Sequence, residues 1–361
     1  MADWLSSMQQ TYEYYTVDPA TWGDVKRLDT IKSCTIDRDS EADTLGSASI
    51  EANEILGESY IRVYLVTIQN GVEERHPLGT FLVQTPSSAF DGKTRSVTMD
   101  AYTPLIELKE KMPEMGYAIV HRVEQKPNIM DEAYKIVRAN VRAPVVQPTC
   151  DKVLHKHFVS DSNENWLTFT RDLIQNADYT FDLDEISRIL FAPKREIDAM
   201  QPVWTFTDDE NSIMYPDINM RHDLYDIPNV VEVVYSNGEY TITKIVKNED
   251  PNSPTSIQRR GREIKRRVTD PGFVADFGTQ GMAEIEVENY AKKLLKELST
   301  VEYEISYTHG YCPVRVGDCV RINYEKAGLM DIKAKVISQS IRCVNGCSVS
   351  EKAVFTTKLW G

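Results

Sequence analysis

The sequence has 361 residues, of which 41% are hydrophobic and 27% are charged, and this composition is typical of folded globular proteins. Its formal net charge of −14 is opposite in sign to that of proteins that grip the nucleic-acid backbone, so we expect no sequence-specific nucleic-acid partner. No apolar run of about 18 residues predicts a membrane span, and the N-terminus lacks the basic start and apolar core of a signal peptide. We therefore expect a protein made in a cytoplasm, with reduced cysteines and no membrane partner.

Residues 1–25 are rich in aromatic and small polar side chains, and they are predicted to form an N-terminal arm rather than a packed element. Four aromatic residues make this segment too apolar for a purely solvated tail. We predict that they contact another subunit, and packing against their own domain is an equally good alternative. These residues are Tyr12, Tyr14, Tyr15 and Trp22.

Residues 26–103 are predicted to form a first β domain. Short runs of β-branched and aromatic residues recur about every 8–12 residues with turn residues between them, a pattern typical of a barrel or sandwich. The clearest run, Tyr60 to Gln69, is followed by Asn70-Gly71, which is a strong hairpin signal. A returning strand is expected from Leu78, and Pro86 is expected to end it.

Residues 104–225 change to helical periodicity and are predicted to form an α+β insert. An amphipathic helix is expected over residues 128–140, with Asn128 as its N-cap. A second helix is expected over residues 162–176, with Ser162 or Asn163 as its cap.

Residues 226–361 are predicted to form a second β domain that carries one helix, at residues 285–298. Val301 to Tyr324 alternates apolar and polar residues around a tight turn at Gly317 and Asp318, so we expect a hairpin there and treat both turn residues as candidate interface residues. Another hairpin is expected around Asn345-Gly346. The predicted fold class is therefore α+β, mainly β, with two barrel-like β domains bracketing an α+β insert.

One basic cluster stands out in this acidic chain. Ion pairing with an acidic neighbouring subunit fits the overall charge better than a nucleic-acid contact does, and a solvated face is about as good an interpretation. The cluster comprises Arg259, Arg260, Arg262, Lys265, Arg266 and Arg267.

His309, Cys312, Cys319, Cys343 and Cys347 suggest a metal site, but their C-x6-C and C-x3-C spacings are not zinc signatures. Cys343 and Cys347 flank a predicted turn and could ligate a soft metal or oxidise, whereas buried free cysteines are usually small apolar core residues. We expect no metal and no cofactor, and we keep a metal-binding module or enzyme as an alternative. No nucleophile elbow, His-Glu-x-x-His or paired-carboxylate motif is present, so we expect no enzyme.

The C-terminal third resembles the baseplate hub or tail-tip hub proteins of tailed phages, a family related to the phage late control protein and to the base of type VI secretion spikes. The resemblance lies in the runs IPNVVEVVYSNGEY, NEDPNSPTS, GREI and THGYCPVRVGDCVRINY, followed by KAKVISQSI. GTFLVQTPSS and AYTPLIELKE in the N-terminal half are compatible with it. The resemblance covers most of the chain and is best over residues 226–361. Its motifs are structural rather than catalytic.

The resemblance implies a homotrimer in the virion tail. In that family each subunit contributes two tube domains, so three copies form a pseudo-six-fold ring between the six-fold tail tube and the three-fold spike or tip. The implied partners are a tail tube or distal tail protein, a spike or tip protein and the tape-measure protein. An acidic lumen, past which DNA slides without binding, would agree with the charge of the chain.

The resemblance leaves one further expectation and one alternative. The sequence ends at Trp360 and Gly361, soon after the last predicted hairpin, so we expect no added cell-wall hydrolase domain. A receptor-binding β protein of the tail tip is the alternative.

Overall fold

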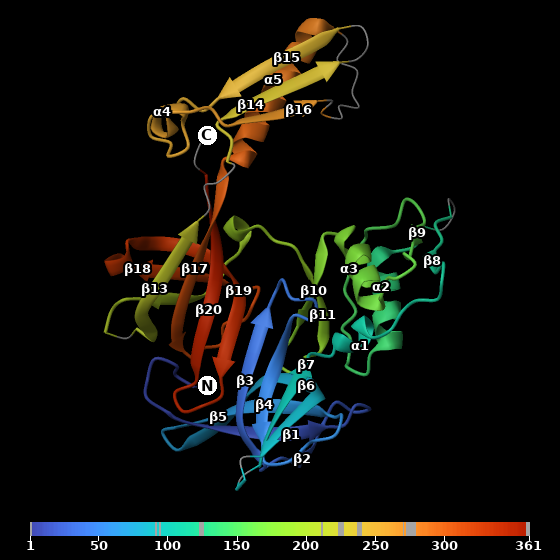
Figure 1. The fold of residues 1–361 in the computed structure, drawn as a ribbon, viewed down its shortest axis with the longest axis vertical. Helices are drawn as coiled ribbons and strands as arrows, with labels where there is room; N and C mark the ends of the chain where they lie inside the picture. Colours follow the sequence, from blue (N-terminus) through green and yellow to red (C-terminus); the bar gives the residue numbers. More distant parts are fainter. Residues whose placement is uncertain are drawn as a thin grey trace. The chain divides into compact units, whose positions relative to one another are not determined.

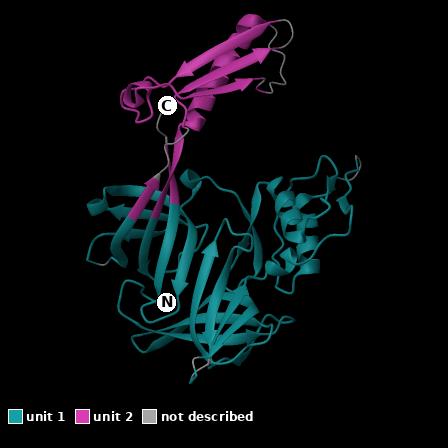
Figure 2. Ribbon diagram, viewed as in Figure 1, with its two compact units in different colours: residues 1–218, 306–353 teal, residues 219–305, 354–361 magenta. Residues whose placement is uncertain are grey.

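The computed structural model describes residues 2–90, 92–93, 95–122, 126–210, 212–222, 227–236, 240–269, 271 and 279–358. The chain divides into two compact units (Figure 2). Unit 1 comprises residues 1–218 and 306–353, and unit 2 comprises residues 219–305 and 354–361. The four-part division expected from the sequence pattern stays a prediction. No helix in the described ranges is long and apolar enough to cross a membrane.

The N-terminal half of unit 1 is an antiparallel sheet. Its strands are β1 (Gln9–Val17), β2 (Asp24–Arg27), β3 (Ile31–Asp39), β4 (Gly46–Ala52), β5 (Tyr60–Gln69), β6 (Val72–Phe90) and β7 (Arg95–Tyr102). They lie in the order β2-β1-β5-β6-β7-β4-β3. The predicted hairpin at Asn70-Gly71 is confirmed, because both residues have positive φ, 53° and 77°, and β5 pairs with β6 on either side of them.

Residues 9–17 form strand β1, which differs from the predicted arm. β1 pairs with β5 along its whole length, from Gln9 opposite Ile68 to Val17 opposite Tyr60. The predicted strand end at Pro86 is also wrong, since β6 continues to Phe90. The described pairing of β6 with β5 ends at Leu82, so β6 has a free edge at Pro86, where a residue without a backbone N–H is tolerated.

The described residues in the middle of the chain contribute three α-helices to unit 1. These are α1 (Ile106–Lys109), α2 (Ile129–Asn140) and α3 (Trp166–Gln175). The predicted cap of α2 is confirmed, because Asn128 Oδ1 accepts hydrogen bonds from the backbone N of Met130 at 2.9 Å and of Asp131 at 3.0 Å. The apolar faces of α2 and α3 are buried in a shared core.

The predicted cap of α3 is wrong. Its cap is Asn165, whose Oδ1 accepts from Thr168 N at 2.9 Å, and not Ser162 or Asn163, so the helix begins later than expected. All three residues are good caps, and sequence preference does not choose between them. The same region holds β8 (Ala118–Ile119), β9 (Phe158–Val159), the hairpin strands β10 (Tyr179–Leu183) and β11 (Ile189–Pro193), and a 3-10 turn at Ile197–Ala199.

The last strands complete the sheet. They are β12 (Pro202–Thr207), β13 (Met214–His222), β17 (Thr300–Gly310), β18 (Cys319–Tyr324), β19 (Leu329–Arg342) and β20 (Ser348–Lys358), with a 3-10 turn at Glu325–Ala327. The predicted hairpin over residues 301–324 is wrong, because β17 lies between β13 and β20, whereas β18 pairs in parallel with β12 and antiparallel with β19. The hairpin predicted around Asn345-Gly346 is confirmed by the adjacent β19 and β20.

Strand β19 joins the two halves of unit 1 (Figure 1). Its first part, Leu329 to Lys335, pairs with β18, and its last part, Ser338 to Arg342, pairs with β3. Strands of both predicted β domains therefore share one sheet of 13 strands. The described path of paired strands is open rather than closed into a barrel, so the class that the structure supports is mainly β with large antiparallel sheets.

Unit 2 is a small sheet covered by one helix. Strands β14 (Val230–Ser236), β15 (Thr241–Lys247) and β16 (Lys265–Thr269) lie in the order β15-β14-β16, and the unit also holds α4 (Ile257–Arg260) and α5 (Gln280–Leu298). α5 packs on the sheet through Val231, Val233, Ile242, Ala283, Val287, Ala291 and Leu295. The helix begins at Gln280, before the predicted start at Ile285, because Thr279 caps it by accepting from Met282 N at 3.3 Å.

We expect the pairing of β19 with β3 to be a main determinant of stability in unit 1. Ile341 lies opposite Ile36, and both side chains are buried. Replacing Ile341 with Ala should lower the free energy of unfolding by about 2–5 kcal/mol, because it removes buried methyl groups and leaves a cavity. Urea unfolding monitored by circular dichroism measures this change. Met330→Ala, at a 68% exposed position of the same strand, is the control, and equal losses in both variants would contradict the prediction.

Candidate functional site

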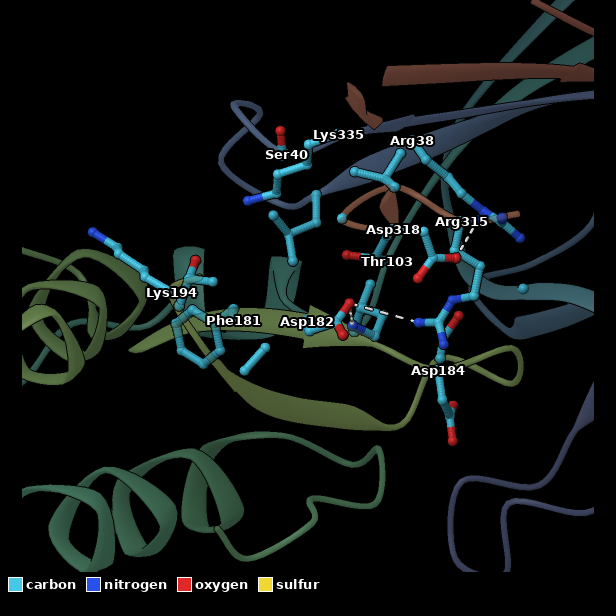
Figure 3. Close-up of a pocket in the computed structure, with 18 of the residues that line it drawn as sticks. Arg38, Ser40, Thr103, Phe181, Asp182, Asp184, Lys194, Arg315, Asp318 and Lys335 are labelled. Atoms are coloured by element: carbon cyan, nitrogen blue, oxygen red, sulfur yellow. Dashed lines mark hydrogen bonds and ion pairs between the residues drawn. The ribbon is translucent and has the colours of Figure 1, made fainter. Parts of the chain in front are cut away.

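A cavity of about 360 Å³ lies within unit 1, where three segments that are distant in sequence meet (Figure 3). Residues from β3 and β6 form one side, residues of the β10–β11 hairpin form another, and the turn before β18 forms the third. Gly79 in β6 has a φ of 147°, and a Cβ added there would lie 2.6 Å from the ring of Phe81, so this part of the lining requires glycine.

The cavity has a positive character in an acidic protein. Five basic and three acidic residues line it: Arg38, Lys194, Arg195, Arg315 and Lys335, and Asp182, Asp184 and Asp318. Apolar residues such as Leu78, Phe81 and Phe181 complete the lining. The arrangement suits binding of a group that has an anionic head and an apolar stem.

Arg315 connects the turn before β18 to the β10–β11 hairpin. Its guanidinium lies 3.1 Å from Glu185 Oε1 and 3.6 Å from Asp182 Oδ1. Its backbone N donates to Asp318 Oδ2 at 2.8 Å, and Gly317, with a φ of 95°, makes the turn that allows this bond. Gly317 and Asp318, predicted as interface residues, therefore lie at the cavity, and Figure 3 shows Asp182 and Asp318 close to Arg315.

Burial changes the acidities of the groups around the cavity. It raises the pKa of Asp182 and of Asp318, and the nearby Arg315 opposes both shifts. Burial also lowers the pKa of the Arg38 guanidinium. Arg38 donates to Leu78 O at 2.6 Å and to Gln339 Oε1 at 3.1 Å, which are neutral acceptors, so its charge is held in place without being neutralised by these bonds.

The strands of the C-terminal half hold a buried polar cluster around Glu351. This carboxylate accepts hydrogen bonds from Tyr307 OH at 2.7 Å and from Gln339 Nε2, and His309 Nε2 lies 3.2 Å from its Oε1. The Sγ of Cys312 lies 3.8 Å from His309 Nδ1. The predicted metal ligands His309 and Cys312 are therefore neighbours, and His309 also contacts the buried Glu351. Burial raises the pKa of the Cys312 thiol, which keeps it protonated.

The other predicted metal ligands do not lie beside His309 and Cys312. Cys343 and Cys347 lie in the core of the N-terminal half together with Cys34, and Cys319 is buried in β18. Within the described ranges, no group of three or more His, Cys, Asp or Glu residues is placed to hold a metal ion. The alternative of a single His and Cys metal site thus has no ligand set in this part of the chain.

The N-terminal aromatic residues pack within unit 1. Tyr14 and Trp22 are buried, and Trp22 Nε1 donates to Ile186 O at 2.9 Å. Tyr12 OH donates to Val344 O at 2.9 Å. The guanidinium carbon of Arg75 lies over the Tyr15 ring, 5.3 Å from the ring centroid. These contacts correspond to the alternative of packing within the chain, and the predicted subunit contact stays a prediction.

The basic cluster lies in unit 2, where part of it is already paired. Glu232 Oε2 lies 3.0 Å from Arg267 and 3.5 Å from Lys265, and the hydrogen bond from Arg267 lowers the pKa of Glu232. Arg259 donates to Pro251 O and Arg260 to Ile227 O, each at 3.0 Å. Arg262 and Arg266 are also exposed, and among the residues that the structure describes neither of them has an ion-pair partner.

The residues that organise the cavity were not predicted from the sequence. Arg315 meets Glu185 across 130 residues of chain, and Arg38 meets Gln339 across 301. No short stretch of sequence reveals these contacts, because a single arginine or acidic residue resembles an ordinary surface residue.

No protein-family model matches the sequence, and no curated protein matches it. Solved structures do match. The tail protein of Neisseria meningitidis MC58 is 12% identical, with 96% of this chain and 97% of that chain covered and a TM-score of 0.62. The 43 kDa tail protein of prophage MuSo2 from Shewanella oneidensis is 12% identical, with 95% and 97% covered and a TM-score of 0.60.

A third match is an E. coli component of the type VI secretion system that is structurally similar to the T4 bacteriophage tail proteins gp27 and gp5. It is 8% identical, with 92% of this chain and 76% of that chain covered and a TM-score of 0.50. At such low identities the matches show a shared fold. The predicted resemblance to phage tail and type VI proteins is therefore confirmed at the level of the fold.

The raised pKa of Asp318 predicts a pH-dependent effect of Asp318→Asn. The folded state holds the Asp318 proton more tightly than the unfolded chain does, so ionising this group lowers stability as pH rises from about 4 through the raised pKa. Asn keeps an acceptor oxygen for Arg315 N but carries no charge. The stability of the variant relative to the parent should therefore increase from pH 4 to pH 7 in thermal unfolding. A difference that is flat or decreases with pH would contradict the prediction.

Asp18→Asn is a control with the opposite sign. The Asp18 carboxylate accepts from Ala20 N at 3.0 Å and from Thr21 Oγ1 at 2.9 Å, and these bonds lower its pKa. Its stabilising effect is complete above the unfolded pKa and is lost as pH falls through the lower folded pKa. This variant should be less stable than the parent protein by a constant difference between about pH 5 and pH 7. The difference should become smaller only below about pH 4.

Proposed function

We propose that this chain is the structural hub of a phage tail tip or baseplate, in which three copies form a ring between the tail tube and the central spike. The observation that carries the proposal is the fold match to phage tail proteins along 95% or more of this chain, with TM-scores of 0.60 and above. A match over the whole length supports the role of the whole chain rather than that of one module.

The internal architecture supports the adapter role. Unit 1 contains an N-terminal and a C-terminal set of strands, and β19 joins them in one sheet. If each set corresponds to one tube domain, three copies supply six such domains around an axis. A ring of this composition presents six similar positions to a six-fold tube and three to a spike. The partners in this proposal are the tail tube or distal tail protein, the spike or tip protein and the tape-measure protein.

The charge of the chain suits a DNA conduit. A net charge of −14 repels the phosphate backbone, so a ring of these subunits would let DNA pass without binding it. The role in this proposal is structural and non-enzymatic, and the location is the virion tail.

Native mass spectrometry over a range of protein concentrations tests the stoichiometry. A trimer that forms with increasing concentration would support the ring. A stable dimer or tetramer at every concentration would contradict the proposed symmetry. Electron microscopy of the oligomer would then show whether six β modules surround a central channel.

We expect Arg262 and Arg266 to contribute to the subunit interface. The double variant Arg262→Glu, Arg266→Glu should shift the monomer–trimer equilibrium toward monomer by roughly tenfold or more, because like charges then face an acidic neighbour. The measurement is sedimentation at a fixed concentration. Lys292→Glu with Lys293→Glu, on the exposed side of α5, is the control with the same change in net charge. Equal weakening in both double variants would indicate a general charge effect rather than a local contact.

A further inference from the structure

Two cysteines face each other where β3 and β19 meet. The register places Ile36 opposite Ile341 and Thr35 opposite Arg342, so the next pair along the two strands is Cys34 and Cys343. Cys343 N donates to Cys34 O at 2.9 Å, which extends the ladder by one step. Residues at hydrogen-bonded positions of an antiparallel pair have Cα atoms about 5.5 Å apart, within the range of about 4.4–6.8 Å that a disulfide spans.

Both cysteines of this pair are buried. Cys34 is 1% exposed and Cys343 is 4% exposed, and both belong to the apolar core of the N-terminal half. The neighbouring Cys34 side chain together with burial raises the pKa of the Cys343 thiol. The pair therefore stays reduced and slow to react under reducing conditions.

Cys347, the partner that the sequence suggests for Cys343, has different surroundings. It has a φ of 36° at the end of the turn, its N donates to Val344 O at 2.9 Å, and burial raises the pKa of its thiol. Cys343 and Cys347 are separated by only three residues, whereas Cys34 lies in β3 and Cys343 directly follows β19. The strand geometry therefore favours Cys34.

We propose that Cys34 and Cys343 are an oxidative modification site, at which peroxide produces a cross-strand disulfide that covalently joins β3 to β19. This inference does not depend on the proposed function, because it concerns the junction inside one chain. In an oxidising environment such a bond would be retained.

The reaction balances with hydrogen peroxide as the oxidant. One cysteine loses its proton and attacks a peroxide oxygen as thiolate, and the O–O bond breaks to give a sulfenic acid and hydroxide. The hydroxide takes up the proton that the thiol released and becomes water. The second sulfur then attacks the sulfenic sulfur, the S–S bond forms as the S–O bond breaks, and a second water leaves. Two thiols and one peroxide thus give one disulfide and two waters. Peroxide is small enough to reach the pair when the end of the ladder opens.

The bond would close a loop that contains most of the chain. A disulfide that closes a long loop restricts the unfolded chain, so oxidation should stabilise the protein. We expect the thermal unfolding midpoint to rise by about 5 °C and to return to its original value after reduction with dithiothreitol.

Peptide mapping tests the proposal on the full chain. The protein is treated with hydrogen peroxide, denatured in N-ethylmaleimide to block free thiols, digested and analysed by mass spectrometry. The expected result is a linked pair of peptides that contain Cys34 and Cys343. Recovery of both residues as free, alkylated thiols under conditions that oxidise the less buried Cys150 would overturn the proposal. A Cys343–Cys347 link in their place would overturn it as well.

Three variants separate the alternatives. Cys343→Ala should abolish both the linked peptides and the rise in unfolding midpoint, whereas Cys347→Ala and Cys150→Ala should keep both. If Cys343→Ala does not fold, the Cys347→Ala protein still decides the question, because it retains Cys34 and Cys343 and lacks the competing thiol. Loss of the link in Cys347→Ala would refute the proposed pair.

Discussion

The pairing of β19 with two successive partners on one edge is the constraint on which unit 1 depends. Residues Leu329 to Lys335 pair with β18, and Ser338 to Arg342 pair with β3. A shift of one residue in β19 would turn every side chain to the opposite face of the sheet, so Val336 and Ile341 would each leave a buried position. The register that seats these apolar residues therefore also fixes how the N-terminal strands meet the C-terminal strands.

The cavity is a consequence of the same register. Gly317 N donates to Val336 O at 2.8 Å, and Val336 N donates to Asp318 O at 2.9 Å, so β19 holds the turn before β18 in place. That turn positions Arg315 against the acids of the β10–β11 hairpin. The backbone hydrogen bonds of Val336 therefore hold the turn that carries Arg315. As a result, charged residues that are far apart in sequence lie close together. Asp182 is shielded in part but its side chain is still 39% exposed, and that of Glu185 is 56% exposed. Solvent therefore limits each ion pair to about 1 kcal/mol, and the pairs orient the turn more than they stabilise it.

The sequence was informative where structure is determined within a few residues. The strand Tyr60–Gln69 and its turn at Asn70-Gly71 were predicted because alternation and positive-φ residues are local features, and the Asn128 cap needed only the next three residues. The hairpin over residues 301–324 was wrong for the complementary reason. Both strands exist, but β18 pairs with β12, which lies more than a hundred residues earlier, and an apolar–polar alternation does not encode its partner. The cavity and the Cys34–Cys343 pair escaped prediction for the same reason, because each is made by long-range pairing.

The junction of β19 with β3 has a further energetic requirement. The described register contains five residue pairs, and each hydrogen bond in it contributes only about 0.5–1.5 kcal/mol net, because water satisfies the same groups in the unfolded chain. A fully buried Ile contributes about 1.5–3 kcal/mol, so Ile36 and Ile341 together supply as much as several of those bonds. The next pair along the ladder, Cys34 and Cys343, adds smaller apolar side chains to the same core. A short junction of this kind is therefore held mainly by its buried side chains.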